Sequence, residues 1–275
     1  RRGGVNLQGT YRPPSSGRVP IEALHVGPSE MAAAVVVGSE AVMRLSLGGM
    51  EVEGEDETLF TPLLPGFHGP PTEKAVEQGI ANVVTGVSVC TKRPLLATCG
   101  ADGTVRVWDY SEGTCEVVHE LADPPLAIAL HPLGLQLTVA HRSLLAVYAI
   151  TAHGLMLIRE LSVKGCDLLR YSPGGGHLAG KSYNRDIFVV DTVTWEDVAQ
   201  LRGHPRRVTS ICWSEDGNEL ASTGAEGAVY TWALDGCTKR AENVSKGADY
   251  TSVLYMPGRA HLVTTDRTAS GGGGG

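Results

Sequence analysis

The sequence lacks the features of a membrane, nucleic-acid-binding or secreted protein. Its longest apolar run, Met31 to Val37, is far shorter than the roughly 20 residues that span a bilayer. The formal net charge of -7 disfavours nonspecific nucleic-acid binding, which depends on neutralising phosphates. The six cysteines contain no Cys-x-x-Cys pair, which favours buried free thiols in a reducing cytosol over disulfides or zinc ligands. No secretory signal opens the chain, and because the first residue is arginine we expect the start to be missing.

Signatures of catalysis and of long helices are also scarce. The nine histidines include no His-x-x-x-His pair, and no Gly-x-Ser-x-Gly elbow is present. No segment sustains a 3.6-residue or heptad period of apolar residues, so we expect little helix and no coiled coil within this stretch. We therefore predict no enzyme activity, no cofactor and no metal site.

Glycine, in contrast, is abundant, with 35 residues, which is typical of short strands joined by tight turns. The most informative stretch runs from Pro94 to Tyr110, where two apolar runs flank a Gly-Ala-Asp-Gly turn. Val105 and Val107 alternate with Thr104 and Arg106, which is the period of a strand with one polar face. Asp-Gly between two such runs predicts a hairpin, because glycine supplies the positive φ of a tight turn.

This hairpin recurs along the chain with a fixed period. Its second run closes on Trp-Asp, the dipeptide that ends the third strand of a WD40 repeat. Third-strand ends follow one another at spacings of 40, 42 and 42 residues, at Trp108, Tyr148, Val190 and Trp232. Turns after the first strands keep spacings of 41, 42 and 42, at His131-Pro132, Ser172-Pro173, Ser214-Glu215 and Met256-Pro257. Together the two series predict an all-β WD40 β-propeller segment of about five to six four-stranded blades, some degenerate or truncated.

The same period divides the chain into parts. We expect a flexible tail over 1–18, a propeller region over 19–266 and a glycine-rich flexible tail over 267–275. The propeller region comprises a degenerate blade at 19–65 with an acidic loop at 48–57, clear blades over 82–244 and a partial blade at 248–266. Propellers close with four to eight blades, and this period is commonest in rings of seven, whereas we count fewer than six complete blades here. We therefore expect this stretch not to be self-sufficient and to self-associate through the unpaired edges of its last strands.

One motif points to a different function. Gly175 to Ser182 reads GGHLAGKS and matches the P-loop pattern, which would make Lys181 a phosphate ligand of a nucleotidase. A P-loop must open a helix whose N–H groups hold the phosphate, whereas here a turn-like stretch and an apolar strand, Ile187 to Asp191, follow at once. We therefore expect Lys181 to be structural or solvent-facing, and its replacement by alanine to be nearly harmless.

WD40 repeats also predict a structural hydrogen-bond network in each blade. We assign Thr98, Asp102 and Trp108 to it in the first clear blade. The fourth clear blade supplies His204, Ser222, Glu226 and Trp232. Glu226 stands where aspartate is usual, and the first clear blade lacks a Gly-His entry. We therefore expect the network to be incomplete in every blade.

Three segments carry a more specific resemblance: Thr85–Tyr110, Val163–Ser172 and Gly224–Leu234. They resemble the cilia- and flagella-associated WD-repeat family numbered fifty-seven, and Cys-x-x-x-Pro-Leu-x-Ala-Thr-Cys is not a general feature of WD40 repeats. The resemblance implies a non-catalytic scaffold of the ciliary axoneme that supports assembly or anchoring of a subset of inner dynein arms. It also implies a downstream coiled coil, through which the full-length protein could oligomerise.

The partners expected from this interpretation are proteins, with no nucleic acid and no membrane. Loops on one face of the propeller gather basic residues, which suggests an acidic partner such as an inner dynein arm component or tubulin. These residues are Arg142, Lys164, Arg185, Arg206, Arg207 and Lys246. The alternative interpretation is that these charges are scattered over the surface and serve only solubility. A general cytosolic WD40 adaptor, in ubiquitination or trafficking, and the nucleotidase remain as alternatives.

Overall fold

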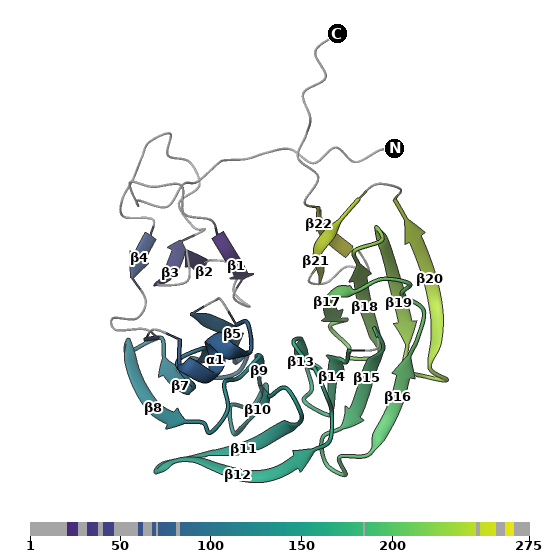
Figure 1. Cartoon of the computed structure of the whole chain (residues 1–275). Helices are drawn as coiled ribbons and strands as arrows, with labels where there is room; N and C mark the ends of the chain where they lie inside the picture. Colours follow the sequence, from purple (N-terminus) through teal and green to yellow (C-terminus); the bar gives the residue numbers. More distant parts are fainter. Residues whose placement is uncertain are drawn as a thin grey trace, which may run out of the picture.

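The computed structural model describes residues 21–26, 32–37, 41–46, 60–62, 68–69, 71–80, 83–183, 185–245, 248–256 and 262–266. These residues form five four-stranded antiparallel sheets and one two-stranded sheet (Figure 1). The fold is all-β and has the meander order of β-propeller blades, as the repeat predicts. The predicted tails, the acidic loop at 48–57 and Lys246 lie outside the described residues.

Each four-stranded sheet consists of four consecutive strands. The first sheet contains β1 (Ile21–Val26), β2 (Ala32–Val37), β3 (Ala41–Ser46) and β4 (Phe60–Pro62). The second contains β5 (Val84–Val89), β6 (Leu95–Gly100), β7 (Thr104–Asp109) and β8 (Thr114–Glu120). The third contains β9 (Ala127–Leu130), β10 (Gln136–Ala140), β11 (Leu145–Thr151) and β12 (Gly154–Leu161).

The remaining sheets continue the same pattern. The fourth contains β13 (Leu169–Tyr171), β14 (His177–Lys181), β15 (Ile187–Asp191) and β16 (Asp197–Leu201). The fifth contains β17 (Val208–Trp213), β18 (Glu219–Gly224), β19 (Ala228–Ala233) and β20 (Thr238–Val244). The last has only β21 (Tyr250–Tyr255) and β22 (Leu262–Asp266).

The sheets from β5 onward follow one another around an arc. The first strands β5, β9, β13, β17 and β21 contact one another in sequence, and the outer strands β12, β16 and β20 face away from them (Figure 1). Buried apolar clusters fill the three successive interfaces between the second and fifth sheets. The second to fifth sheets therefore bury their facing surfaces against one another, which explains why these blades need their neighbours for stability.

The repeat is also visible in the backbone irregularities. The pairing of third and fourth strands slips at Val107/Trp108, Val147/Tyr148, Val189/Val190 and Thr231/Trp232. These are the third-strand ends that the sequence period aligns. A slip at the same position in four sheets is a conserved bulge of the repeat, because an extra residue opposite one partner turns the strand more sharply. The predicted register is therefore correct.

One short helix lies in the connection before the second sheet, and it is the only helix among the described residues. Helix α1 (Glu73–Glu77) starts at Thr72, whose hydroxyl accepts a hydrogen bond from the Ala75 N–H at 3.3 Å. The side chain of Ala75 is buried, and the Thr72 N–H donates to the Ala101 carbonyl at 2.9 Å. The connection is thus packed onto the β6–β7 turn.

Self-association of this stretch remains a prediction. Among the described residues, β22 pairs only with β21, so no described strand covers the N–H and C=O groups of its outer edge. We expect purified residues 1–275 to form oligomers in size-exclusion chromatography with light scattering. A stable monomer that melts cooperatively would contradict this expectation.

Candidate functional site

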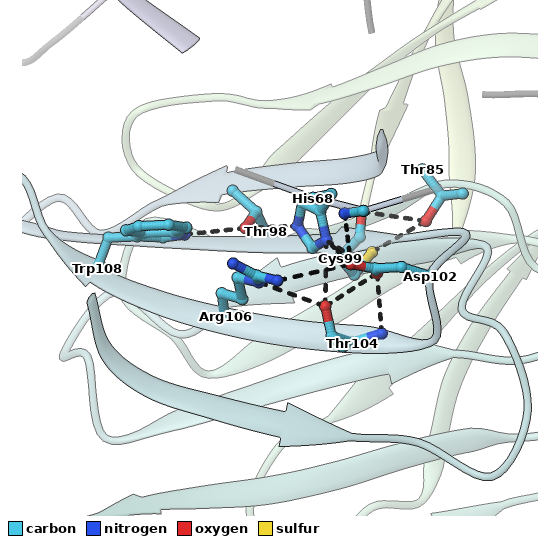
Figure 2. A network of polar contacts seen from close by, with 9 residues as sticks. His68, Thr85, Thr98, Cys99, Asp102, Thr104, Arg106 and Trp108 are labelled. Atoms are coloured by element: carbon cyan, nitrogen blue, oxygen red, sulfur yellow. Dashed lines mark hydrogen bonds and ion pairs between the residues drawn. The ribbon is translucent and has the colours of Figure 1, made fainter. Parts of the chain in front are cut away.

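A buried hydrogen-bond network ties the second sheet to the connection before it (Figure 2). The His68 ring lies between Asp102 and Thr98. Its Nδ1–H donates to the Asp102 carboxylate at 3.0 Å, and its Nε2 accepts from the Thr98 hydroxyl at 3.0 Å. The Thr98 oxygen accepts in turn from Trp108 Nε1–H at 3.0 Å. With the hydrogen assigned to Nδ1, one ring orientation serves both Asp102 and Thr98 and links the β6–β7 turn to both strands.

Asp102 is the anchor of this network. Burial alone would raise the pKa of its carboxyl, but hydrogen bonds from His68 and the Gly69 N–H, with a smaller one from the Thr104 hydroxyl, lower that pKa to about 2. Arg106 lies 3.7 Å from the same carboxylate. The carboxylate is therefore charged throughout the physiological range and holds the turn in place.

The fifth sheet contains a second network of the same kind. His204 Nε2 is 2.7 Å from the Ser222 hydroxyl, which accepts from Trp232 Nε1–H at 2.8 Å. The Nδ1 atom of His204 is hydrogen-bonded to Glu226, which takes the place of aspartate. The Tyr230 ring lies against His204, with 4.4 Å between the ring centroids. The longer glutamate side chain thus reaches the histidine without breaking the arrangement.

The expectation that the network is incomplete in every blade was wrong for these two sheets. His68 was missed because it precedes Thr98 by 30 residues, whereas His204 precedes Ser222 by 18. The additional residues include α1, which lies between His68 and β5. The sequence does contain a clue, the pair His68-Gly69. It has the two residue types of the Gly-His pair that precedes the fifth sheet, but in reversed order.

The third and fourth sheets lack the network for a simple reason. The register that aligns Leu96 with Trp108 and Leu220 with Trp232 aligns Leu137 with Tyr148 and Leu178 with Val190. Two residues after those leucines stand Val139 and Gly180, which have no hydroxyl group. A Cβ at Gly180 would lie 2.4 Å from the Phe188 ring, so the phenyl group fills the space instead.

These networks predict how stability depends on pH. Burial lowers the pKa of His204 below its ordinary value of 6.5, against the opposing hydrogen bond to Glu226. The folded state favours the neutral form of His204. Its contribution to the free energy of unfolding is therefore fully present above pH 6.5 and decreases as the pH falls below that value. Burial lowers the pKa of His131 and His141 in the same direction. Asp102 adds a second loss between about pH 4 and pH 2.

Urea unfolding at pH 7, 6 and 5 tests the first of these steps. The free energy of unfolding should decrease over this range, and the slope should be smaller in a His204→Asn variant. A stability that rises on acidification, or an unchanged slope in the variant, would contradict the assignment.

In addition to the networks, the end of α1 and segments of the third, fourth and fifth sheets line an open pocket of about 390 Å³. Its lining comes from the end of α1, the start of β9, the β10–β11 turn, the β12–β13 connection, the β14–β15 turn and the connection before β17. The cationic side chains on it are Arg142, Lys181, Arg185 and Arg207, and the single carboxylate is Asp167. The structure thus gathers three of the six predicted basic residues. Lys164 and Arg206 are exposed but do not line the pocket.

Lys181 is not solvent-facing, although the sequence allowed that position for it. Its side chain is 7% exposed, with Nζ 2.6 Å from Asp167 Oδ1 and donating to the Val208 carbonyl at 3.2 Å. The residue is the last of β14, and the next described element is the strand β15, which begins at Ile187, rather than a helix. The P-loop geometry is therefore absent here, and the lysine links three segments of neighbouring sheets.

The expectation that Lys181→Ala is nearly harmless must be revised accordingly. The carboxylate of Asp167 is 41% exposed and can be hydrated after loss of the lysine, so Lys181→Met should cost about 1–2 kcal/mol of unfolding free energy. Asp167→Asn leaves a buried ammonium without its counterion and should cost about 3 kcal/mol. Urea denaturation of the two variants measures the difference, and equal costs would contradict the asymmetry.

The comparison with protein families matches two ranges, residues 77–109 and 195–233, to the WD40 family, described as WD domain, G-beta repeat. The chain carries WD40 repeats. The matched ranges end at the third strands that contain Trp108 and Trp232, so each includes the tryptophan of one network, although His68 lies before the first range. The third and fourth sheets have the same four-stranded fold but lack these hydrogen-bond networks.

Several relatives of this WD-repeat chain are associated with cilia or microtubules. Mouse cilia- and flagella-associated protein 57 is 33% identical over 174 residues, which is 63% of this chain and 14% of the relative. Tetrahymena thermophila cilia- and flagella-associated protein 57 A is 29% identical over 218 residues, 78% of this chain and 16% of the relative. The 77 kDa echinoderm microtubule-associated protein of Lytechinus variegatus is 25% identical over 182 residues, 62% of this chain and 27% of the relative.

The chain therefore spans only a small part of the relatives it matches. Within the described part of the WD-repeat chain, no helix is long and apolar enough to cross a bilayer. No cluster of three or more histidine, cysteine, aspartate or glutamate side chains there could hold a metal ion. The similarity supports a cilium-related WD-repeat scaffold whose function depends on protein contacts.

Proposed function

We propose that this chain is part of a non-catalytic WD-repeat scaffold of the ciliary or flagellar axoneme, which supports assembly or anchoring of a subset of inner dynein arms. The similarity to cilia- and flagella-associated protein 57 over up to 78% of the chain carries this proposal. WD40 propellers present a rigid face of loops, which suits a protein that holds partners rather than one that transforms a substrate.

The basic pocket supports an acidic protein partner. Four cationic side chains and one carboxylate line it in a chain whose formal net charge is -7. Such a local reversal of charge steers an oppositely charged partner to one face and orients it there. The tubulin surface is a second candidate partner beside the dynein arms, because a relative is named as a microtubule-associated protein.

A tagged full-length protein in a ciliated cell tests the proposal. We expect the tag to be in the cilium and to remain with the axoneme after the membrane has been removed with detergent. Tagged protein that stays in the cell body would favour the cytosolic adaptor and contradict the axonemal scaffold. The matched control is an unrelated WD-repeat protein carrying the same tag, which should be washed out.

A further inference from the structure

The basic pocket is built as one preorganised unit. The Gly165 N–H donates to the Arg142 carbonyl at 2.9 Å, which joins the β10–β11 turn to the β12–β13 connection. The Tyr183 ring lies directly on Gly165, where a Cβ would approach it to 2.1 Å. The Arg185 guanidinium donates to the Pro205 carbonyl and so fixes the β14–β15 turn to the segment that carries Arg207. Loops tied together in this way lose little further freedom when a ligand binds.

Two of the four positive charges of this unit, those of Arg142 and Arg185, have no carboxylate partner among the described residues. The single pocket carboxylate, Asp167, is 2.6 Å from Lys181 Nζ and 3.8 Å from an Arg207 nitrogen, so Lys181 already balances its charge. In the part of the chain that the structure describes, Arg142 and Arg185 have no carboxylate partner. Asp186, next to Arg185, is paired instead with Arg202 at 3.1 Å. The pocket therefore presents the guanidinium groups of Arg142 and Arg185 without a carboxylate partner, and Arg185 keeps further N–H donors beside the one that it gives to the Pro205 carbonyl.

The size and lining of the pocket indicate what it can accept. A volume of about 390 Å³ lies at the lower end for ligand sites, and it suits one side chain rather than a folded domain. Guanidinium groups match the two oxygens of a carboxylate with paired hydrogen bonds. Tyr183 and Leu126 supply apolar surface on the pocket wall for the methylene groups of such a side chain.

We propose that this pocket is an anchor site for one glutamate side chain of an extended acidic peptide, with the carboxylate held by Arg142, Arg185 and Arg207. The anchor site depends on one part of the proposed function, that the chain binds a protein partner, and not on its location in the axoneme. Lys181 and Asp167 act as positioning residues, because their ion pair holds the β12–β13 connection and Arg207 at the pocket wall. One side chain anchored in the pocket fixes the register of the bound peptide on the basic face, which diffuse charge attraction alone does not do.

The test uses the full chain and fluorescein-labelled ten-residue peptides, measured by fluorescence anisotropy. The probes are a peptide of alternating glutamate and glycine, the same peptide with glutamine, and one with a single phosphoserine in place of one glutamate. We expect the glutamine peptide to bind at least ten-fold more weakly than the glutamate peptide. Phosphoserine binding ten-fold tighter than glutamate would overturn the assignment to a carboxylate.

Variants distinguish the pocket from general attraction between charges. Arg142→Gln and Arg185→Gln should each weaken binding of the glutamate peptide about ten-fold, since each removes one charged hydrogen-bonding group. Arg207→Lys keeps the charge but loses the guanidinium fork, and it should weaken binding about three-fold. Lys92→Gln, in the turn between β5 and β6 at the other end of the sheet, is the matched control and should change binding less than two-fold.

Three further results would overturn the proposal: equal binding of the glutamate and glutamine peptides, equal effects of Arg142→Gln and Lys92→Gln, or no loss with Arg185→Gln. All four substituted residues are exposed, and unchanged thermal melting checks that each variant folds. This experiment measures peptide binding in solution, whereas the test of the proposed function measures localisation in cells. A negative result in one therefore does not imply a negative result in the other.

Discussion

Replacing Trp108 or Trp232 with alanine is expected to lower the free energy of unfolding by about 3–5 kcal/mol. The two indoles are only 2% and 3% exposed, so alanine would leave a large cavity in either sheet. Each substitution also removes an N–H that donates to the central hydroxyl of its network, Thr98 or Ser222. Since domains are stable by only about 5–15 kcal/mol, soluble yield should fall sharply.

Phenylalanine separates the two contributions. Trp108→Phe and Trp232→Phe keep much of the apolar volume and lose the hydrogen bond, so we expect a cost of about 1–3 kcal/mol. Trp195→Ala is a control of the same residue type, because Trp195 lies half-buried in the turn after β15 and should cost less than about 2 kcal/mol. Urea denaturation followed by circular dichroism measures all five variants. An alanine variant with the stability of wild type would contradict the packing described here.

The second large effect is expected from His68. Its side chain is fully buried, and His68→Ala would leave the Asp102 carboxylate and the Thr98 hydroxyl without their shared partner. We expect a cost of about 3 kcal/mol, which combines a lost hydrogen bond to a charged group with an unsatisfied buried group. His153→Ala is the control, because His153 is exposed in the β11–β12 turn and should change stability by less than about 0.5 kcal/mol.

A double-mutant cycle shows whether His68 acts through Asp102. The combined variant His68→Ala, Asp102→Ala should cost clearly less than the sum of the single variants, because the second change removes the group that the first left unsatisfied. Strict additivity would indicate that the two side chains are not coupled and would contradict the network.

The repeat was predictable from the sequence because it depends on local rules. Alternating apolar residues and the Asp-Gly turn predicted the hairpin of β6 and β7, and the spacing of Trp108 and Trp232 aligned the third-strand ends, where the structure then shows bulges that were not predicted. These features are determined by residues close together in the chain, so a period of about 42 residues transfers them from one blade to the next.

What the sequence did not reveal depends on contacts between distant segments. His68 enters the second sheet across an inserted helix, so a fixed period misses it. Burial of Lys181 depends on Asp167 and the Val208 carbonyl, which come from two other segments. The period placed six basic residues on one face, but only loop packing decides that Arg142, Arg185 and Arg207 line one pocket. Which of the six basic residues line the pocket is therefore determined by tertiary structure and not by the repeat period.

Retention of the full-length protein in axonemes tests the central claim, that the basic face attaches a WD-repeat scaffold to an acidic axonemal partner. Arg185, Arg206 and Arg207 are reversed to glutamate in a tagged protein that replaces the endogenous one, and Lys92→Glu serves as the control for added negative charge. After detergent extraction at moderate salt, we predict that wild type and the Lys92 variant stay bound. The triple variant should be released while its melting temperature is unchanged. Equal retention of all three proteins would contradict the account.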